Sequence, residues 1–330
     1  MATLDLLSIG DASYDVFLRP QESESLCQLN NKESLICFGY GSKIPVRDMD
    51  FTIGGNAANN AVGVRRLGIS VGIVITLGAD EVGNQILISL EKEGVDTTFA
   101  IPQVSTTSNY SVILSYAGER TIFTYKVPRS YEFPVKMPET PWIYLTSMGD
   151  TFRPFYNHLM DFLKLNPQIK LGFNPGGRQI KAGLDQIKDI ISKTDVIFVN
   201  REEAQELTGM ADSHSKEKDL LMALVKLGVK NPVVTDGNNG SFVYEGSRFL
   251  KCGVLPVDAY ERTGAGDAFG TGCMAALIKG KGFEEALVWG TVNSASVIGY
   301  TGAQKGLLRE NEMPIWIERA RSSGVKVEVF

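Results

Sequence analysis

The apolar and polar positions divide most of the chain into short apolar runs that alternate with longer segments of helical periodicity. Short runs rich in β-branched residues are typical of buried strands, and apolar residues spaced by three and four predict amphipathic helices. This alternation predicts a mostly parallel sheet with helices on both faces. We expect strands at residues 4–9, 71–77, 142–146, 169–173, 196–199 and 232–235, and helices at 57–67, 84–93, 155–165, 180–192, 202–207 and 216–227.

The C-terminal third has a different pattern, in which helical segments rich in small residues follow one another directly. We expect helices at 264–279, 283–299 and 310–322 and a last strand at 325–330. The chain shows no internal repeat, no low-complexity tract and no long linker. We therefore expect one domain over residues 1–330.

Two pairs of strand-like segments in the N-terminal half interrupt this alternation. Residues 111–116 and 121–127 predict a hairpin that turns at Gly118-Glu119, and residues 35–40 and 43–53 predict another that turns between Gly39 and Gly41. Residues 21–34 add polar length beside them. We interpret these segments as one small β lid, drawn from about residues 13–20, 35–53 and 108–127. The alternative is that they are edge strands of the main sheet.

Composition narrows the chemistry without naming it. The 330 residues include 43% hydrophobic and 22% charged residues, an ordinary globular balance. There are only two His, which cannot form a three-His metal site, so the 38 Asp and Glu are the more plausible acid–base groups. The 34 Gly exceed the average share and indicate tight turns or close backbone approaches.

Charge and missing motifs exclude several partners and mechanisms. A net charge of −5 argues against nucleic acid as a partner, and no apolar stretch is long enough to span a membrane. Four Cys without a CxxC pair and an N-terminus unlike a secretory signal predict a reduced, cytoplasmic protein. The P-loop, the GxGxxG dinucleotide fingerprint, the GxSxG elbow and the HExxH zinc motif are all absent.

The strongest local signal is a Gly-Ala-Gly turn, Gly264-Ala265-Gly266, that runs directly into a helix at Asp267. Turn glycines and the first helical turn leave backbone N–H groups unpaired, and the helix dipole adds positive potential, so this segment predicts an anion pocket. The same dipole is expected to keep Asp267 ionised, as suits a base that takes a proton from an alcohol. An anion pocket beside a carboxylate base fits phosphoryl transfer. The alternative is that Asp267 only caps the helix.

A second signal is the segment GGNAANNA, residues 54–61, which opens a predicted helix. Asn56, Asn59 and Asn60 are poor helix formers, but their amides both donate and accept hydrogen bonds, which matches the hydroxyls of a polyol. The alternative is a capped helix that packs closely through its Ala face.

Together, GGNAANNAVGVRRLG and ERTGAGDAFGTG resemble the two signatures of the PfkB family of ribokinase-like carbohydrate kinases. They lie in the order and near the ends expected for that family. The resemblance implies a ribokinase-like three-layer α/β/α domain with a mostly parallel central sheet and a small β lid. It also implies an ATP- and Mg²⁺-dependent kinase that acts on a small-molecule sugar or nucleoside.

The resemblance also assigns roles to individual residues. It implies that Asp267 is the catalytic base and that Gly264, Ala265 and Gly266 form the anion hole. The NREE segment matches a motif that helps to place Mg²⁺, with Asn200 and Glu203 acting through water; the alternative is a capping pair on a helix. The substrate-binding residues would be Ser13, Asp15, Gly54, Gly55, Asn56 and Asn59. The nucleotide-binding residues would be Asn200, Thr235, Gly237, Gly240, Thr263 and Asn293.

Three positions depart from the pattern of the family. Glu261 stands where relatives with a monovalent-cation site carry an Asp, so it is the candidate ligand for K⁺ and dependence on K⁺ stays open. Asn56 and Ser13 differ from the residues of ribokinase itself, which argues against strict ribose specificity.

The resemblance leaves three functions open: a sugar kinase, a nucleoside kinase with a wider lid formed by residues 21–53, and a non-catalytic sugar or nucleotide sensor. The intact Asp267, Asn200 and Glu203 argue against the sensor. A homodimer that pairs through the lid is the expected assembly, because an exposed β face would be buried in this way.

Overall fold

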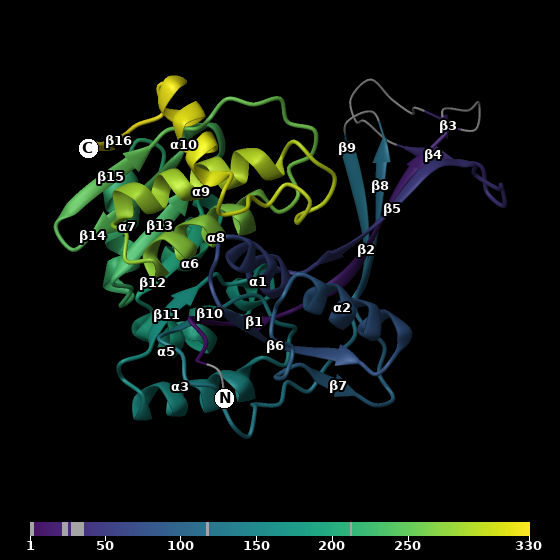
Figure 1. Cartoon of the computed structure of the whole chain (residues 1–330), viewed down its shortest axis with the longest axis horizontal. Coiled ribbons are helices and arrows are strands. Elements are labelled where there is room, and N and C mark those ends of the chain that lie inside the picture. The colour runs from purple at the N-terminus through teal and green to yellow at the C-terminus, as the bar shows by residue number, and fades with distance from the viewer. Residues whose placement is uncertain (1–2, 22–25, 28–35, 117–118, 212) are drawn as a thin grey trace.

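The main sheet has ten strands in the order β16-β15-β14-β13-β12-β11-β10-β1-β6-β7 (Figure 1). The computed structural model describes every residue except 1–2, 22–25, 28–35, 117–118 and 212. All neighbours from β13 to β7 pair in parallel, and β14 to β16 add an antiparallel edge. The strands are β1 (Leu6–Gly10), β6 (Val71–Gly78), β7 (Ile101–Gln103), β10 (Trp142–Leu145), β11 (Lys170–Phe173), β12 (Val196–Asn200), β13 (Asn231–Thr235), β14 (Ser241–Glu245), β15 (Arg248–Cys252) and β16 (Val327–Val329).

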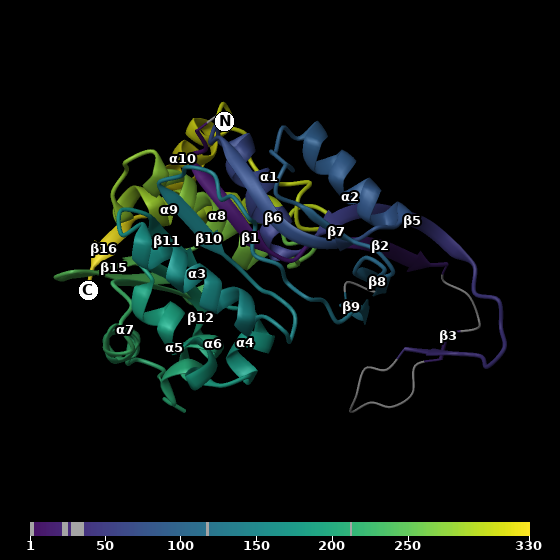
Figure 2. The same cartoon turned by 90° about the horizontal axis from the view of Figure 1, so that it is seen from below.

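Helices cover both faces of this sheet, so the body has three layers (Figure 2). One apolar core lies between the sheet and α1, α2, α8, α9 and α10, and the other lies between the sheet and α3 to α7. The predicted three-layer fold with a mostly parallel sheet is confirmed. The helices are α1 (Asn56–Arg66), α2 (Glu81–Lys92), α3 (Arg153–Leu165), α4 (Gly177–Lys181), α5 (Leu184–Lys193), α6 (Arg201–Thr208), α7 (Glu217–Lys226), α8 (Ala265–Ile278), α9 (Phe283–Val297) and α10 (Met313–Ser322).

A second, four-stranded sheet in the order β5-β2-β8-β9 projects from one side of the body (Figure 1). We call it the small sheet. It is separate from the main sheet, so the interpretation of these segments as edge strands is wrong. Its strands are β2 (Ser13–Pro20), β5 (Val46–Gly54), β8 (Tyr110–Tyr116) and β9 (Glu119–Tyr125), and the short pair β3 (Leu26–Cys27) and β4 (Cys37–Phe38) lies beyond them.

The two faces of the small sheet differ in chemistry. Residues paired across neighbouring strands share a face, and residues two apart on one strand do so too. The register places Phe51, Val16, Val112 and Phe123 in one row, which makes that face apolar. Asp15 lies on the opposite face, with Thr52, Ser111 and Thr124 beside it in the register.

Two local predictions differ from the structure. The expected helix at 180–192 is divided into α4 and α5 at Gly183, whose φ of 93° suits glycine and interrupts the helix. The expected hairpin over 35–53 is wrong where it is described, because β5 pairs with β2 and β4 pairs with β3. Residues 22–25 and 28–35, which include most of the extra polar length, and the predicted turn residue Gly118 lie outside the described residues.

Within the described part of the chain, none of the helices combines the length and the apolar character needed to cross a bilayer.

Candidate active site

The polar residues that the sequence singled out gather where the parallel strands end. The chain leaves β1 toward β6 on one side and continues through β10 to β13 on the other, so the strand order reverses between β1 and β10. Crevices at such points are the usual ligand sites of open α/β sheets. Three adjoining cavities of about 340, 280 and 220 Å³ lie here, and each shares lining residues with the next. We call them the outer, middle and inner cavities.

The turn before α8 brings its backbone to the outer and middle cavities. Gly264 is the N-cap of α8, with a left-handed φ of 78°, and a Cβ there would collide with the Cβ of Ala303. Ala265 and Gly266 line the outer cavity, and Gly266 also lines the middle one. The first turn of α8 therefore presents unpaired N–H groups to a space that an anion could enter.

Asp267 lies in the first turn of α8 and lines the middle cavity. The N-cap is Gly264, and the Oδ2 of Asp267 accepts a hydrogen bond of 2.8 Å from the Nδ2 of Asn59, so the interpretation of Asp267 as a helix cap is wrong. Burial raises the pKa of Asp267 to about 6, although the bond from Asn59 opposes this. At neutral pH a carboxylate with this pKa is ionised, and burial, which the sequence did not reveal, raises the pKa against the expected effect of the helix dipole.

Asn200 and Glu203 also line the middle cavity, opposite Asp267. They form a reciprocal capping box at the start of α6: Glu203 N–H donates to Asn200 Oδ1 over 2.8 Å, and Asn200 N–H donates to Glu203 Oε2 over 2.9 Å. The capping interpretation is thus confirmed, and it is compatible with a site because the pair faces the cavity. Burial raises the pKa of Glu203, and the Asp267 carboxylate adds to this effect.

The inner cavity lies between the body and the polar face of the small sheet. Ser13, Asp15, Gly55 and Asn56 line it, as the sequence predicted for one site. Ser13 Oγ donates to Asp15 Oδ1 over 3.0 Å, and burial raises the pKa of Asp15. Gly54 does not line the cavity but packs directly against the Asp15 carboxylate, so that a Cβ there would displace it.

The outer cavity is largely apolar on one side and glycine-rich on the other. Thr235, Gly237 and Gly240 line it, at the end of β13 and in the turn after it, together with residues of the loop before α8 and of α9. Val254, Leu255 and Phe269 supply much of its apolar surface. A flat, partly apolar ligand with an anionic end would find both kinds of wall here.

Three predicted site residues lie elsewhere than expected. Asn59 lines none of the three cavities, since its amide bridges Asp267 and Gln304. Asn293 is fully buried and holds α9 in place by donating to the Ala268 carbonyl and accepting from the Leu308 N–H. Thr263, expected at the nucleotide, lines the inner cavity instead.

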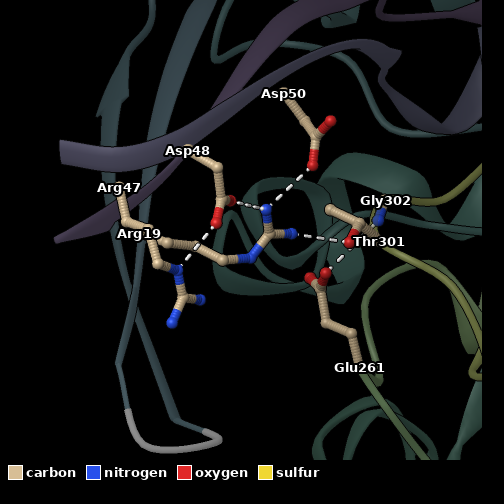
Figure 3. A network of polar contacts seen from close by, with 7 residues as sticks. All are labelled: Arg19, Arg47, Asp48, Asp50, Glu261, Thr301 and Gly302. Atoms are coloured by element: carbon tan, nitrogen blue, oxygen red, sulfur yellow. Dashed lines mark hydrogen bonds and ion pairs between the residues drawn. The ribbon is translucent and has the colours of Figure 1, made fainter. Parts of the chain in front are cut away.

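Glu261 is held by protein groups on several sides. Its carboxylate accepts a hydrogen bond from the Thr263 hydroxyl and another of 3.2 Å from the Gly302 N–H, which Figure 3 shows. Arg120 of β9 lies 3.7 Å from its Oε1. The arrangement joins the loop before α8 to the small sheet.

Sequence reasoning missed several residues that line the inner and middle cavities. Lys126 and Ser147 line both cavities, Asn174 lines the middle one and Asp11 the inner one. Asp11 is buried and accepts a hydrogen bond of 2.7 Å from the Tyr131 hydroxyl, and burial raises the pKa of Asp11. Asp11, Ser147 and Asn174 follow the ends of β1, β10 and β11, so the strand-end rule could have identified them. Lys126 follows β9 and carried no such signal.

Comparisons with known proteins agree with this architecture. A family model described as "pfkB family carbohydrate kinase" matches residues 5–310. The chain is 27% identical over 293 residues to the ribokinase of Haemophilus influenzae, covering 85% of this chain and 92% of that protein. It is 27% identical to the aminoimidazole riboside kinase of Salmonella typhimurium, covering 88% and 86%. The structure of the Arabidopsis thaliana ribokinase complexed with ribose and ATP matches with a TM-score of 0.77 at 20% identity, covering 96% and 99%.

Proposed function

This chain belongs to the pfkB family of carbohydrate kinases, and from that premise we propose that it transfers a phosphoryl group from ATP to a hydroxyl of a sugar or sugar-like molecule. The observation that carries the proposal is the position of Asp267. Its carboxylate lines the middle cavity, which adjoins the inner cavity on one side and the outer cavity on the other.

Asp267 acts as the general base in this proposal. A carboxylate with a pKa of about 6 is ionised at neutral pH and is a stronger base than an exposed carboxylate. It would orient the attacking hydroxyl and accept its proton as the oxygen–phosphorus bond forms. The Asn59 amide holds one carboxylate oxygen in place.

The turn Gly264–Gly266 provides the anion hole. The N–H groups of the first turn of α8 lie beside Asp267, where negative charge develops on the transferred group. Because these donors belong to a buried helix, they are oriented before the reaction begins.

The acceptor molecule would bind in the inner cavity and ATP in the outer one. Asp15 and Asn56 offer a carboxylate and an amide to the hydroxyls of the acceptor, while the small sheet covers them as a lid. The glycine-rich turn after β13 leaves room for phosphates, and the apolar wall with Val254 and Leu255 accommodates a base. The similar ribokinase of Arabidopsis thaliana was solved in complex with ribose and ATP, which supports a site for both a sugar and a nucleotide.

Magnesium fits the middle cavity as a water-mediated ion. Glu203 and Asn200 use oxygen atoms in their own capping box, so they would reach the ion through water. Among the residues that the structure describes, no group of three or more acidic, His or Cys side chains forms a ready-made metal site. Magnesium would neutralise phosphate charge. Glu261 remains the candidate ligand for K⁺. Its carboxylate would then bind the ion while it also accepts hydrogen bonds from Thr263 and Gly302.

A nucleoside acceptor is a second candidate of the same class. A relative is named aminoimidazole riboside kinase, which acts on a ribose bearing a ring. The homodimer remains a proposal as well, supported by the exposed apolar face of the small sheet.

The direct test is a panel of sugars, phosphosugars and nucleosides assayed for ATP-dependent phosphorylation. For the acceptor with the highest kcat/KM, we expect Asp267→Asn to lower kcat by about 10²–10⁴-fold. In the unchanged protein, kcat should fall as the pH drops through about 6, because the protonated carboxyl cannot accept a proton. Asp185→Asn, on an exposed carboxylate of α5, is the matched control. Near-full turnover by Asp267→Asn would refute the role of this residue, and binding without turnover across the panel would favour a sensor.

A further inference from the structure

The segment Thr301-Gly302-Ala303-Gln304 contacts three different parts of the site with four consecutive residues. Thr301 accepts a hydrogen bond of 2.7 Å from Arg19 of the small sheet (Figure 3). Ala303 packs against Gly264, the first residue of the turn Gly264–Gly266, which we call the anion turn. Gln304 Nε2 donates to Asn59 Oδ1 over 3.1 Å. The segment follows α9 and belongs to none of the motifs described above.

The contact of Gln304 decides which way the Asn59 amide faces. An Asn side chain has one carbonyl oxygen, which accepts, and one NH₂ group, which donates. Since Gln304 donates to Oδ1, that oxygen must face Gln304, and Nδ2 must face Asp267, to which it donates over 2.8 Å. If the amide turned over, its oxygen would face the carboxylate and the donor to Asp267 would be lost.

Other hydrogen bonds fix the positions of Gln304 and Asn59 relative to each other. The main-chain carbonyl of Gln304 accepts a hydrogen bond of 2.7 Å from Nη1 of Arg66, the last residue of α1, and Asn59 lies on the same helix. Arg66 is in turn held by both carboxylate oxygens of Glu93. The donor and the amide that it orients are therefore fixed relative to each other.

We propose that Gln304 is a positioning residue of the kinase, which acts through Asn59 to present a hydrogen-bond donor to Asp267. The inference rests on the proposed role of Asp267 as the base. It adds a residue that lies 37 positions after Asp267 in the chain, outside both signatures. As a consequence, the pKa of Asp267 depends on a side chain that contacts neither the substrate nor Asp267 itself.

The surroundings of Asp267 define what else acts on its ionisation. Glu203 of α6 and Tyr144 of β10 interact with it electrostatically, and Lys126, after β9, lines the same cavity. None of these groups is bonded to Gln304 among the contacts of the described residues. Gln304→Leu therefore alters the Asn59 donor without changing any charge, whereas Gln304→Glu also adds a carboxylate near Asp267.

The test uses the full-length variants Gln304→Glu and Gln304→Leu. In Gln304→Glu a carboxylate faces Asn59 Oδ1, and the repulsion favours the reversed amide; in Gln304→Leu the orienting donor is missing. We expect the pKa of Asp267 to rise by about one in Gln304→Glu and by less in Gln304→Leu, measured by NMR titration of ¹³C-labelled Asp carboxyls and assigned with Asp267→Asn. The acid limb of kcat should move to higher pH by the same amount, with KM changed by less than about twofold.

Thr271→Val is the matched control, because it removes the hydrogen bond from Asn60, a second amide bridge between α1 and α8, and leaves Asn59 intact. It should leave the pKa of Asp267 unchanged. An unchanged pKa in folded Gln304→Leu would overturn the proposal, because the carboxylate of Gln304→Glu can also raise the pKa of Asp267 by direct repulsion. The NMR titration does not depend on turnover, so a failure of Asp267 as the base would be seen separately, as activity retained by Asp267→Asn.

Discussion

The site is built from two regions that hold their polar groups by different means. In the body, Asp267, Asn200 and Gly266 lie on helix N-termini and strand ends whose positions are set by two buried cores. On the small sheet, Asp15 projects from the polar face of an outlying sheet whose other face carries exposed aromatic side chains. The body meets the small sheet in part through polar contacts, such as the hydrogen bond from Arg19 to Thr301, which Figure 3 shows, and the ion pair of Arg120 with Glu261.

The difference separates two requirements of a kinase. Charge stabilisation needs donors that do not move during the reaction, and a helix terminus packed in a core provides them. Recognition of the acceptor needs a surface that can vary and can open, and a sheet that projects from the body and meets it in part through polar contacts provides that. Changes in the body should therefore act mainly on kcat, and changes in the small sheet mainly on KM.

The largest effect on this comparison is expected from Gly264→Ala. A methyl group there would meet Ala303, and the left-handed φ of 78° disfavours any residue with a Cβ. We expect kcat to fall by about 10²-fold or more, with a smaller change in KM for the acceptor. Steady-state kinetics with the best acceptor of the panel measures both values.

Gly280→Ala is the control for Gly264→Ala, because Gly280 has a φ of 77° and open space around its Cβ position. Both variants carry the conformational strain, but only Gly264→Ala disturbs the anion turn. Equal losses of kcat in the two variants would mean that strain, and not the geometry of the anion turn, limits the reaction.

A smaller effect, mainly on KM and not on kcat, is expected from Asp15→Asn on the small sheet. The variant keeps the shape of the side chain and loses the charge that would accept hydrogen bonds from the acceptor. We expect KM for the acceptor to rise by about 10- to 100-fold and kcat to fall less. The exposed Asp219→Asn on α7 is the control. A fall in kcat with an unchanged KM would place Asp15 in the chemistry and contradict the separation.

How much the sequence predicted follows the same division. Apart from β7, β14 and β15 and the break between α4 and α5, the strands and helices of the body were predicted within a few residues, because they are fixed by local apolar periodicity. The pairing of the small sheet was predicted only in part, since β5 pairs with β2 across about 30 residues of chain and no local pattern encodes that partner. The hairpin of β14 and β15 was missed because its strands follow a glycine-rich turn that was assigned only to the nucleotide.

The site shows the same limit at the level of single residues. Asp267 and the glycines before it form one continuous motif, so the sequence placed them together. Gln304 and Lys126 reach the site only through tertiary structure, and neither was predicted. The raised pKa of Asp267 was not predicted for a related reason, because burial depends on elements distant in the chain whereas the helix dipole is a local feature.

The smallest effect on activity is expected from the apolar face of the small sheet. Phe51 and Phe123 are 52% and 59% exposed and lie in one row across four strands, so a second copy of the sheet could cover them. We expect the double change Phe51→Ser and Phe123→Ser to convert a dimer to a monomer in sedimentation velocity, with kcat altered by less than about threefold, because Asp15 faces the other way. Ile315→Ser, on the exposed side of α10, should leave the dimer intact. A monomeric unchanged protein would contradict the dimer, and a loss of kcat as large as that of Gly264→Ala would show that the outer face of the small sheet, like the body, supports the chemistry.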